Sequence, residues 1–172
     1  MLKRLITLSL LTLVIACGGR NVAPIEGDTL KETVKVYIDD SISYYDPIII
    51  ASNIKQECNT LGNDLSDYIQ TYSKDYNIEI IQVEDVSSVT NGYAFDLKIR
   101  NAVSAGNAWT GHKKQVLIAG NLLKDSNQVK DFTASRNSMG GFFAGFKGSC
   151  DVLDRTVNTL GKDTAAWLSQ TL

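Results

Sequence analysis

The stretch that decides the fold is Tyr93-Ala94-Phe95-Asp96-Leu97-Lys98-Ile99-Arg100. Its aromatic and aliphatic residues alternate with small or charged ones, which is the pattern of a strand with one buried and one solvated face. The turn dipeptide Asn91-Gly92 stands directly before it and marks where the strand begins. This stretch therefore predicts a sheet that is covered on one face only.

Similar but shorter patterns predict the other strands of the sheet. They lie at residues 34–39, 78–83, 116–122 and 129–135. A loop is expected over residues 104–111, and Lys124-Asp125-Ser126-Asn127 is expected to turn one strand back on the next. Three consecutive antiparallel strands of this kind form a meander.

A long amphipathic helix is predicted over residues 53–76. Its apolar residues recur at steps of three or four: Ile54, Cys58, Leu61, Leu65, Tyr68, Tyr72 and Tyr76. Ser52 or Asn53 is the expected N-cap, and Asn77 ends the helix. The tyrosines are interpreted as a half-buried helix face, with an aromatic binding cage as the alternative. The preceding run, residues 48–50, is either a short strand or the lead-in to this helix.

A last helix is predicted to begin at Ser149, which can act as its cap. Its apolar stripe consists of Leu153, Val157, Leu160, Trp167 and Leu168. Together these elements predict a two-layer α+β sandwich, in which two helices cover one face of a largely antiparallel sheet of four or five strands.

The sequence Asn-Thr-Leu-Gly occurs in both predicted helices, at residues 59–62 and 158–161. One interpretation is a duplication whose two helices meet through Gly62 and Gly161. The other is that two helices solve the same packing problem on one sheet. We favour the second interpretation and expect each glycine to let its helix approach the sheet.

The N-terminus has the parts of a secretory signal peptide. Basic residues in Met1-Leu2-Lys3-Arg4 precede an apolar run that ends at Val14-Ile15-Ala16-Cys17. The run from Leu5 to Ala16 is shorter than the ~20 residues of a membrane span. The small residue before Cys17 resembles the lipobox of bacterial lipoproteins.

That resemblance implies cleavage before Cys17 and attachment of lipid to it, which would anchor the protein in the membrane. Gly18 after the cysteine implies, by the same resemblance, the outer membrane, with the domain in the periplasm. The predicted organisation is a signal peptide over residues 1–16, a lipidated tether over 17–33 and one α+β domain over 34–172. The alternatives are an ordinary cleaved signal or a buried N-terminal helix.

The charge of the chain argues against nucleic acid as a partner. The chain has 17 Lys and Arg against 19 Asp and Glu, so that loss of Lys3 and Arg4 leaves a formal charge near −4. These charges are interspersed and form no basic stripe. Affinity for nucleic acid comes mainly from neutralising phosphates, so we expect none.

Two cysteines remain once Cys17 is assigned to lipid. In an exported protein, Cys58 and Cys150 are expected to form a disulfide, and two unpaired buried thiols are the alternative. A metal site is not expected, because His112 is the only histidine and the sequence contains no Cys-x-x-Cys.

The sequence contains no recognisable catalytic motif, so we expect neither an enzyme nor a cofactor. His112 lies beside two lysines at a strand start, where we expect it to be exposed. The acidic pairs Asp39-Asp40 and Glu84-Asp85 are interpreted as solvated turn residues. The segment 140–149 has glycines, a lysine and a serine, but it lacks the contiguous Gly-Lys-Ser of a phosphate loop.

Two aromatic segments are candidate contact surfaces. Phe142, Phe143 and Phe146 stand among glycines, and Trp109 lies in the predicted loop. The alternatives are that the phenylalanines cover the open end of the sandwich and that Trp109 packs over the sheet edge.

Four segments together resemble an uncharacterised family of small bacterial lipoproteins. These are N-I-K-Q-E-C at 53–58, W-T-G-H-K-K at 109–114, S-M-G-G at 138–141 and K-G-S-C at 147–150. The resemblance implies no activity. The predicted function is non-enzymatic: a lipid-anchored lipoprotein that contributes to envelope assembly or maintenance by contacting an envelope protein. The alternative is a periplasmic module that binds a lipid, a glycan or another small ligand.

Overall fold

The computed structural model describes residues 32–107, 111–139 and 149–172, all within the unit Glu32–Leu172. Several sequence predictions fall on residues outside these ranges: the signal peptide, Cys17, most of the tether, Trp109, Phe142, Phe143 and Phe146.

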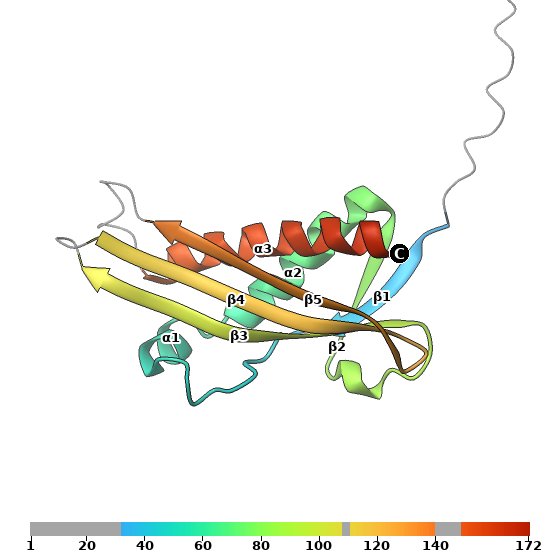
Figure 1. Ribbon diagram of the computed structural model, residues 1–172, viewed down its shortest axis with the longest axis horizontal. Coiled ribbons are helices and arrows are strands. Elements are labelled where there is room, and N and C mark those ends of the chain that lie inside the picture. Colours follow the sequence, from blue (N-terminus) through green and yellow to red (C-terminus); the bar gives the residue numbers. More distant parts are fainter. Residues whose placement is uncertain (1–31, 108–110, 140–148) are drawn as a thin grey trace, which may run out of the picture. The chain divides into compact units, whose positions relative to one another are not determined.

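Five strands form one mixed sheet in the order β2-β1-β3-β4-β5 (Figure 1). They are β1 (Val34–Asp39), β2 (Ile78–Val83), β3 (Tyr93–Asn107), β4 (Gly111–Lys124) and β5 (Asn127–Met139). β1 runs parallel to β2 and β3, whereas β3, β4 and β5 form the predicted antiparallel meander. The predicted fold class, with its mostly antiparallel sheet, is confirmed.

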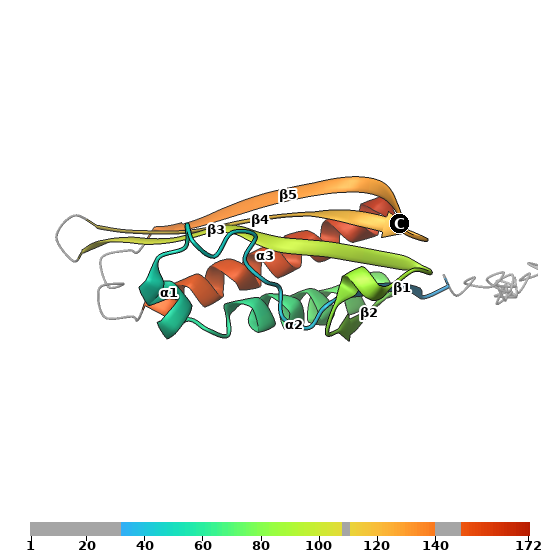
Figure 2. The same cartoon turned by 90° about the horizontal axis from the view of Figure 1, so that it is seen from below.

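Two main helices pack against the same face of this sheet, α2 (Leu61–Ser73) and α3 (Ser149–Thr171) (Figure 2). The shorter elements are α1 (Ser52–Glu57) and the 3-10 helices η1 (Lys74–Tyr76) and η2 (Val86–Ser88). Asn77 ends η1 in the left-handed conformation, with a φ of 56°, which asparagine tolerates better than most residues.

The prediction of one continuous helix over residues 53–76 is wrong. The chain leaves the helix at Cys58, with φ −112° and ψ 48°, and α2 starts only at Leu61. The apolar period continues through this break because Ile54, Cys58 and Leu61 are all buried, so periodicity alone does not reveal it. The residue that caps α1 is Ala51, without a side-chain hydrogen bond, and not Ser52 or Asn53.

The three long strands extend beyond their predicted ends. Residues 104–107 and Gly111 belong to β3 and β4, although they were expected in a loop. Backbone pairing continues through them, from Ser104 opposite Lys114 to Asn107 opposite Gly111. Small and polar side chains suggested a loop there, but ladder hydrogen bonds depend on the backbone and not on side-chain hydropathy.

The core lies between the sheet and α2 with α3. Alternate residues of β3, namely Phe95, Leu97 and Ile99, are almost completely buried. Helix residues that are equally buried include Leu65, Ile69, Leu153, Val157, Leu160 and Leu168. At the β5 side of the core, the Trp167 ring lies 4.7 Å from Phe132 and 5.5 Å from Phe95, centroid to centroid. The stripes predicted from spacing therefore form this interface.

The two repeated glycines do not meet, and the expectation that each lets its helix approach the sheet is also wrong. A Cβ on Gly161 would lie 2.5 Å from the Cβ of Tyr68 on α2. A Cβ on Gly62 would overlap the backbone oxygen of Ile42, in the loop after β1. Each glycine thus permits a close contact, but with the other helix in one case and with a loop in the other.

Candidate contact surface

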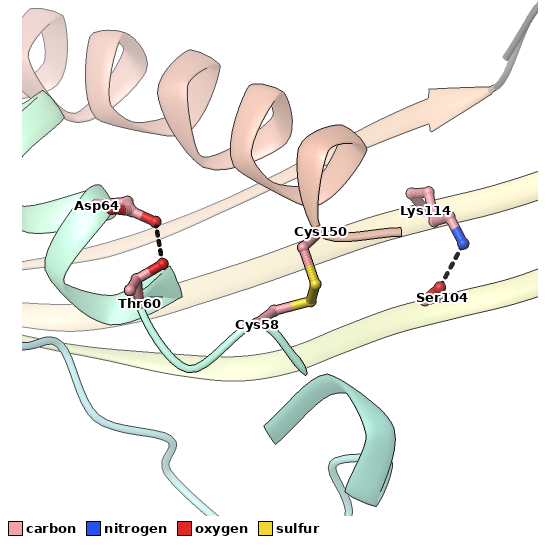
Figure 3. The surroundings of a disulfide bond; sticks show 6 residues. All are labelled: Cys58, Thr60, Asp64, Ser104, Lys114 and Cys150. Atoms are coloured by element: carbon pink, nitrogen blue, oxygen red, sulfur yellow. Dashed lines mark hydrogen bonds between the residues drawn. A yellow bond between two sulfur atoms is a disulfide. The ribbon is translucent and has the colours of Figure 1, made fainter. Parts of the chain in front are cut away.

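A disulfide joins Cys58 to Cys150, with the Cα atoms 5.2 Å apart. Cys58 lies in the break between α1 and α2, and Cys150 lies in the first turn of α3 (Figure 3). The bond therefore connects the N-terminal ends of α2 and α3 and also holds the end of α1. A cavity of about 320 Å³ beside it is lined by four carboxylates, among them Asp64 and Asp151.

The neighbouring part of the sheet contains a buried lysine. Lys114 is 5% exposed, and its ammonium group donates a hydrogen bond to the hydroxyl of Ser104 on β3 (Figure 3). Burial lowers the pKa of Lys114 below its ordinary value, because desolvation disfavours the charged form.

The two acidic pairs lie at the ends of the adjacent parallel strands β1 and β2, as expected, but one of the four residues is not solvated. Asp39 is 7% exposed. One of its carboxylate oxygens accepts from the Val86 N–H at 2.7 Å, and the other lies 2.9 Å from the Lys98 ammonium. Asp40, Glu84 and Asp85 are exposed. The Asp39 carboxylate is therefore a structural link between β1, β3 and η2.

Three further observations concern His112, metal binding and membrane-spanning helices. The backbone of His112 in β4 pairs with that of Gly106 in β3, and the His112 side chain lies outside what the structure describes. Within the described ranges, no group of three or more His, Cys, Asp and Glu side chains could hold a metal ion. The helices among these residues include none that is long and apolar enough to cross a membrane.

Among the described residues, the three most exposed large apolar side chains lie together in the loop between β1 and α1. We call residues 44–50 the Ile48 loop. Ile48 is 89% exposed, Tyr45 62% and Ile49 60%. The run 48–50 is thus not a strand. Ile48 and Ile49 lie in a turn, and the run leads into α1, whose cap is Ala51, which is the second of the two alternatives.

Specific contacts hold the Ile48 loop in place. On its N-terminal side, Tyr44 bridges to Ile99 of β3, and the Tyr45 N–H donates to the Ile99 carbonyl at 2.9 Å. On its C-terminal side, the loop is anchored by Ile50, which is 2% exposed. The loop therefore continues along the edge of β3 beyond the end of β1.

The tip of the loop is ordered by polar groups. The Asp46 carboxylate accepts from the Ile48 N–H at 2.8 Å, and the Lys55 ammonium donates to the Pro47 carbonyl at 2.8 Å. The Arg100 guanidinium stacks 3.5 Å over the Tyr45 ring, a favourable cation–π contact. The two isoleucines are thus presented to solvent by a fixed backbone, which the Asp-Pro turn signal alone did not indicate.

Large side chains from the sheet and from both main helices are buried at the interface between them. The cavities found there open at its edges, beside β2, beside β5 and at the disulfide. A ligand pocket near Trp109 or Phe142 would fall outside the described residues.

Comparison with solved structures shows a shared fold. The chain is similar to protein XCC0632 from Xanthomonas campestris, of the family DUF330, with 11% identity and a TM-score of 0.55, over 81% of this chain and 87% of that one. No family model matches the chain, and no curated protein matches it in sequence.

Other similar structures are bacterial lipoproteins. A minor lipoprotein from Acinetobacter baumannii has 9% identity and a TM-score of 0.46, over 80% of this chain and 94% of that one. Rare lipoprotein B from Shewanella oneidensis has 8% identity and a TM-score of 0.37, over 79% and 91% respectively. At these identities the likeness concerns the arrangement of sheet and helices.

Proposed function

We propose that this chain is a lipid-anchored envelope lipoprotein that acts through protein contacts and not through catalysis. The Ile48 loop is its contact surface, and the observation that carries the proposal is the 89% exposure of Ile48 on a loop with a fixed backbone. The lipobox-like sequence around Cys17 supports the anchor. Gly18 after it favours the outer membrane.

The chemistry of the loop fits a protein partner. Fully burying an exposed isoleucine side chain contributes ~1.5–3 kcal/mol, and Ile48 and Ile49 are 89% and 60% exposed, so both have apolar surface to bury. Tyrosine and arginine are enriched among the residues that dominate binding energy at interfaces, and Tyr45 stacks with Arg100 beside the isoleucines. Because the backbone is already ordered, binding costs little conformational entropy.

Photocrosslinking in native cells tests this proposal. A photoreactive amino acid at position 48 of the full, lipidated chain is expected to give a discrete adduct with one envelope protein. The matched control is position 129, because Val129 is also an exposed aliphatic residue, at 52%. Equal adducts at both positions, or crosslinks to lipid alone at position 48, would contradict the proposal.

A double substitution distinguishes loss of the contact with the partner from loss of folding. Ile48→Ser with Ile49→Ser removes apolar surface that is exposed in the free protein, so the denaturation midpoint should stay unchanged while the adduct from a probe at position 45 disappears. Cys17→Ser tests the anchor separately, since it should abolish lipid labelling and leave the precursor uncleaved. Normal processing of that variant would exclude the anchor.

A further inference from the structure

A second surface lies at the opposite edge of the meander, along β5. Within the described ranges, β5 pairs with β4 on one side and with no strand on its other side. Its thirteen residues therefore present alternate backbone N–H and C=O groups at the sheet edge. Such an edge is a template for another extended chain.

Helix α3 packs beside this edge (Figure 1), and a groove lies between the two elements. Two cavities of about 340 and 290 Å³ adjoin at Arg136. Residues 134–136 of β5 form one wall of the first, and residues 136–138 form one wall of the second. The opposite wall includes Arg155, Thr159, Asp163, Trp167 and Gln170 of α3. These helix residues recur at steps of three or four and so lie in one stripe. We call this surface the β5 groove.

The two ends of the β5 groove differ in chemistry. One end holds an apolar patch of Ala134, Ala166 and the partly exposed Trp167, which is bordered by the polar side chains of Ser135 and Gln170. The other end has Arg155, which is exposed and forms no ion pair with a described residue. Between them Arg136 donates to both oxygens of Asp163 at 2.6 and 2.8 Å, so these two charges neutralise each other.

This geometry points to a binding site for an extended peptide segment, which adds to β5 as a sixth strand. Main-chain hydrogen bonds to a sheet edge give affinity in such complexes, and pockets for alternate side chains give specificity. The apolar patch and Arg155 flank residues 134 and 138, which lie ~13 Å apart along a strand. The segment therefore has an apolar residue and, four positions away on the same face, an acidic one.

The charge of the groove favours such a segment over a second copy of this chain. Arg155 is the unpaired charge of the β5 groove, in a chain of net negative charge. Two copies that paired antiparallel through β5 around Arg136 would place Arg155 of each copy at the Trp167 end of the other. The one carboxylate among the described residues that line that end, Asp163, is already paired with Arg136, so Arg155 would remain without a counter-charge. This surface is separate from the Ile48 loop, because the loop lies beside β3 and the groove beside β5.

The test is a titration of the full chain, in detergent, with a fluorescent peptide of alternating Thr and Val that contains one Leu and, four positions later, one Glu. Fluorescence polarisation should show binding, and a matched peptide with Lys in place of Glu should bind about tenfold more weakly. Arg155→Glu should reverse this preference. Lys162→Glu makes the same charge change at an exposed position of α3 that does not line the groove, and it should leave the preference intact.

Strand pairing has its own readout. A Glu peptide with alternate amides N-methylated on its pairing edge cannot donate to β5, so it should lose binding even to the unsubstituted protein. Several outcomes would overturn the inference: equal affinity for the Glu and Lys peptides, no binding of either at about 1 mM, or full binding of the N-methylated peptide. A dimer in sedimentation that Arg155→Glu dissociates would also overturn it, since the groove would then be a self-interface.

Discussion

The phenol of Tyr68 on α2 donates a 2.9 Å hydrogen bond to the carboxylate of Asp154 on α3. One turn further along both helices, Tyr72 donates to Asn158 at the same distance. Both pairs are separated by 86 residues, so the two helices run parallel and in register. Burial and the hydrogen bond to Asp154 both raise the pKa of Tyr68.

Tyr68→Phe should lower the free energy of unfolding by ~1 kcal/mol at neutral pH, the contribution of one such hydrogen bond. Tyr76→Phe is the control, because the Tyr76 phenol has no hydrogen-bond partner in the described part of the chain. Urea denaturation of both variants measures the difference. Equal stabilities would show that the bond between the helices contributes nothing.

The raised pKa of Tyr68 predicts that the stability of the protein depends on pH. The folded-state pKa of Tyr68 is raised above its ordinary value of 10.0, so the folded state retains its proton longer than the unfolded state does. This stabilisation is complete below pH 10.0 and is lost as the pH rises through the folded-state pKa. Denaturation midpoints of wild type and Tyr68→Phe should therefore converge at alkaline pH, and a constant gap would contradict the prediction.

Gly161→Ala should destabilise the protein although alanine favours helix by ~1 kcal/mol. The new Cβ would lie 2.5 Å from the Tyr68 Cβ and 3.1 Å from its carbonyl carbon, and neither atom is the end of a flexible side chain. Separating the helices should cost ~1–3 kcal/mol. Lys162→Ala, one residue on and exposed, should leave the midpoint nearly unchanged. A Gly161→Ala protein as stable as wild type would refute the close contact.

Removing the disulfide should also destabilise the domain. The double variant Cys58→Ala, Cys150→Ala should lose ~2–4 kcal/mol, as expected for a bridge that closes a long loop. Reduced wild type should denature at the same midpoint as the double variant. A shift in gel mobility on reduction, absent in Cys58→Ala, checks the bond directly. Protease cleavage within residues 44–58 should accelerate, because Cys58 holds the end of α1.

The ion pair between Lys98 and Asp39 should contribute more to the free energy of unfolding than an exposed ion pair does. Lys98→Met leaves the buried Asp39 carboxylate without its cation and should cost ~2 kcal/mol. In the exposed pair Lys35–Glu79 the charged atoms are 3.7 Å apart and both side chains are more than half exposed, so Lys35→Met should cost less than ~1 kcal/mol.

The pH dependence of the Lys98 pair has the same sign as that of Tyr68. Burial by itself lowers the pKa of Lys98, but hydrogen bonds to Asp39 and Asp96 raise it above 10.5 overall. The stabilisation is therefore present below pH 10.5 and is lost as the pH rises through the folded-state pKa. Wild type should lose stability there faster than Lys98→Met, and parallel profiles would exclude this contribution.

Local sequence patterns were sufficient to predict a strand with alternating apolar residues and a tight turn. The alternation at residues 93–100 predicts the N-terminal half of β3, and Lys124 to Asn127 forms the predicted turn, with positive φ at Asp125 and Ser126. The cysteine count predicts the pair that the structure joins. These predictions succeed because each depends on a few neighbouring residues or on a simple count.

Contacts between distant segments could not be read in the same way. Asp39 has the local pattern of a solvated turn acid, and its burial depends on Lys98, 59 residues away. Ile48 and Ile49 look like core residues by hydropathy alone, but the bridge from Tyr44 to Ile99 and the anchor at Ile50 leave them in solvent. Hydropathy describes a residue's preference and not its position.

The sequence by itself therefore determined the strands, the class of the fold and the cysteines available for a disulfide, because periodicity and composition act locally. The tertiary structure decided that β1 lies between β2 and β3, that the helix breaks at Cys58, and that Gly161 meets Tyr68. It also decided which apolar residues remain outside the core. Each of these depends on the packing of segments that are far apart in the chain, where shape and backbone hydrogen bonds outweigh local preference.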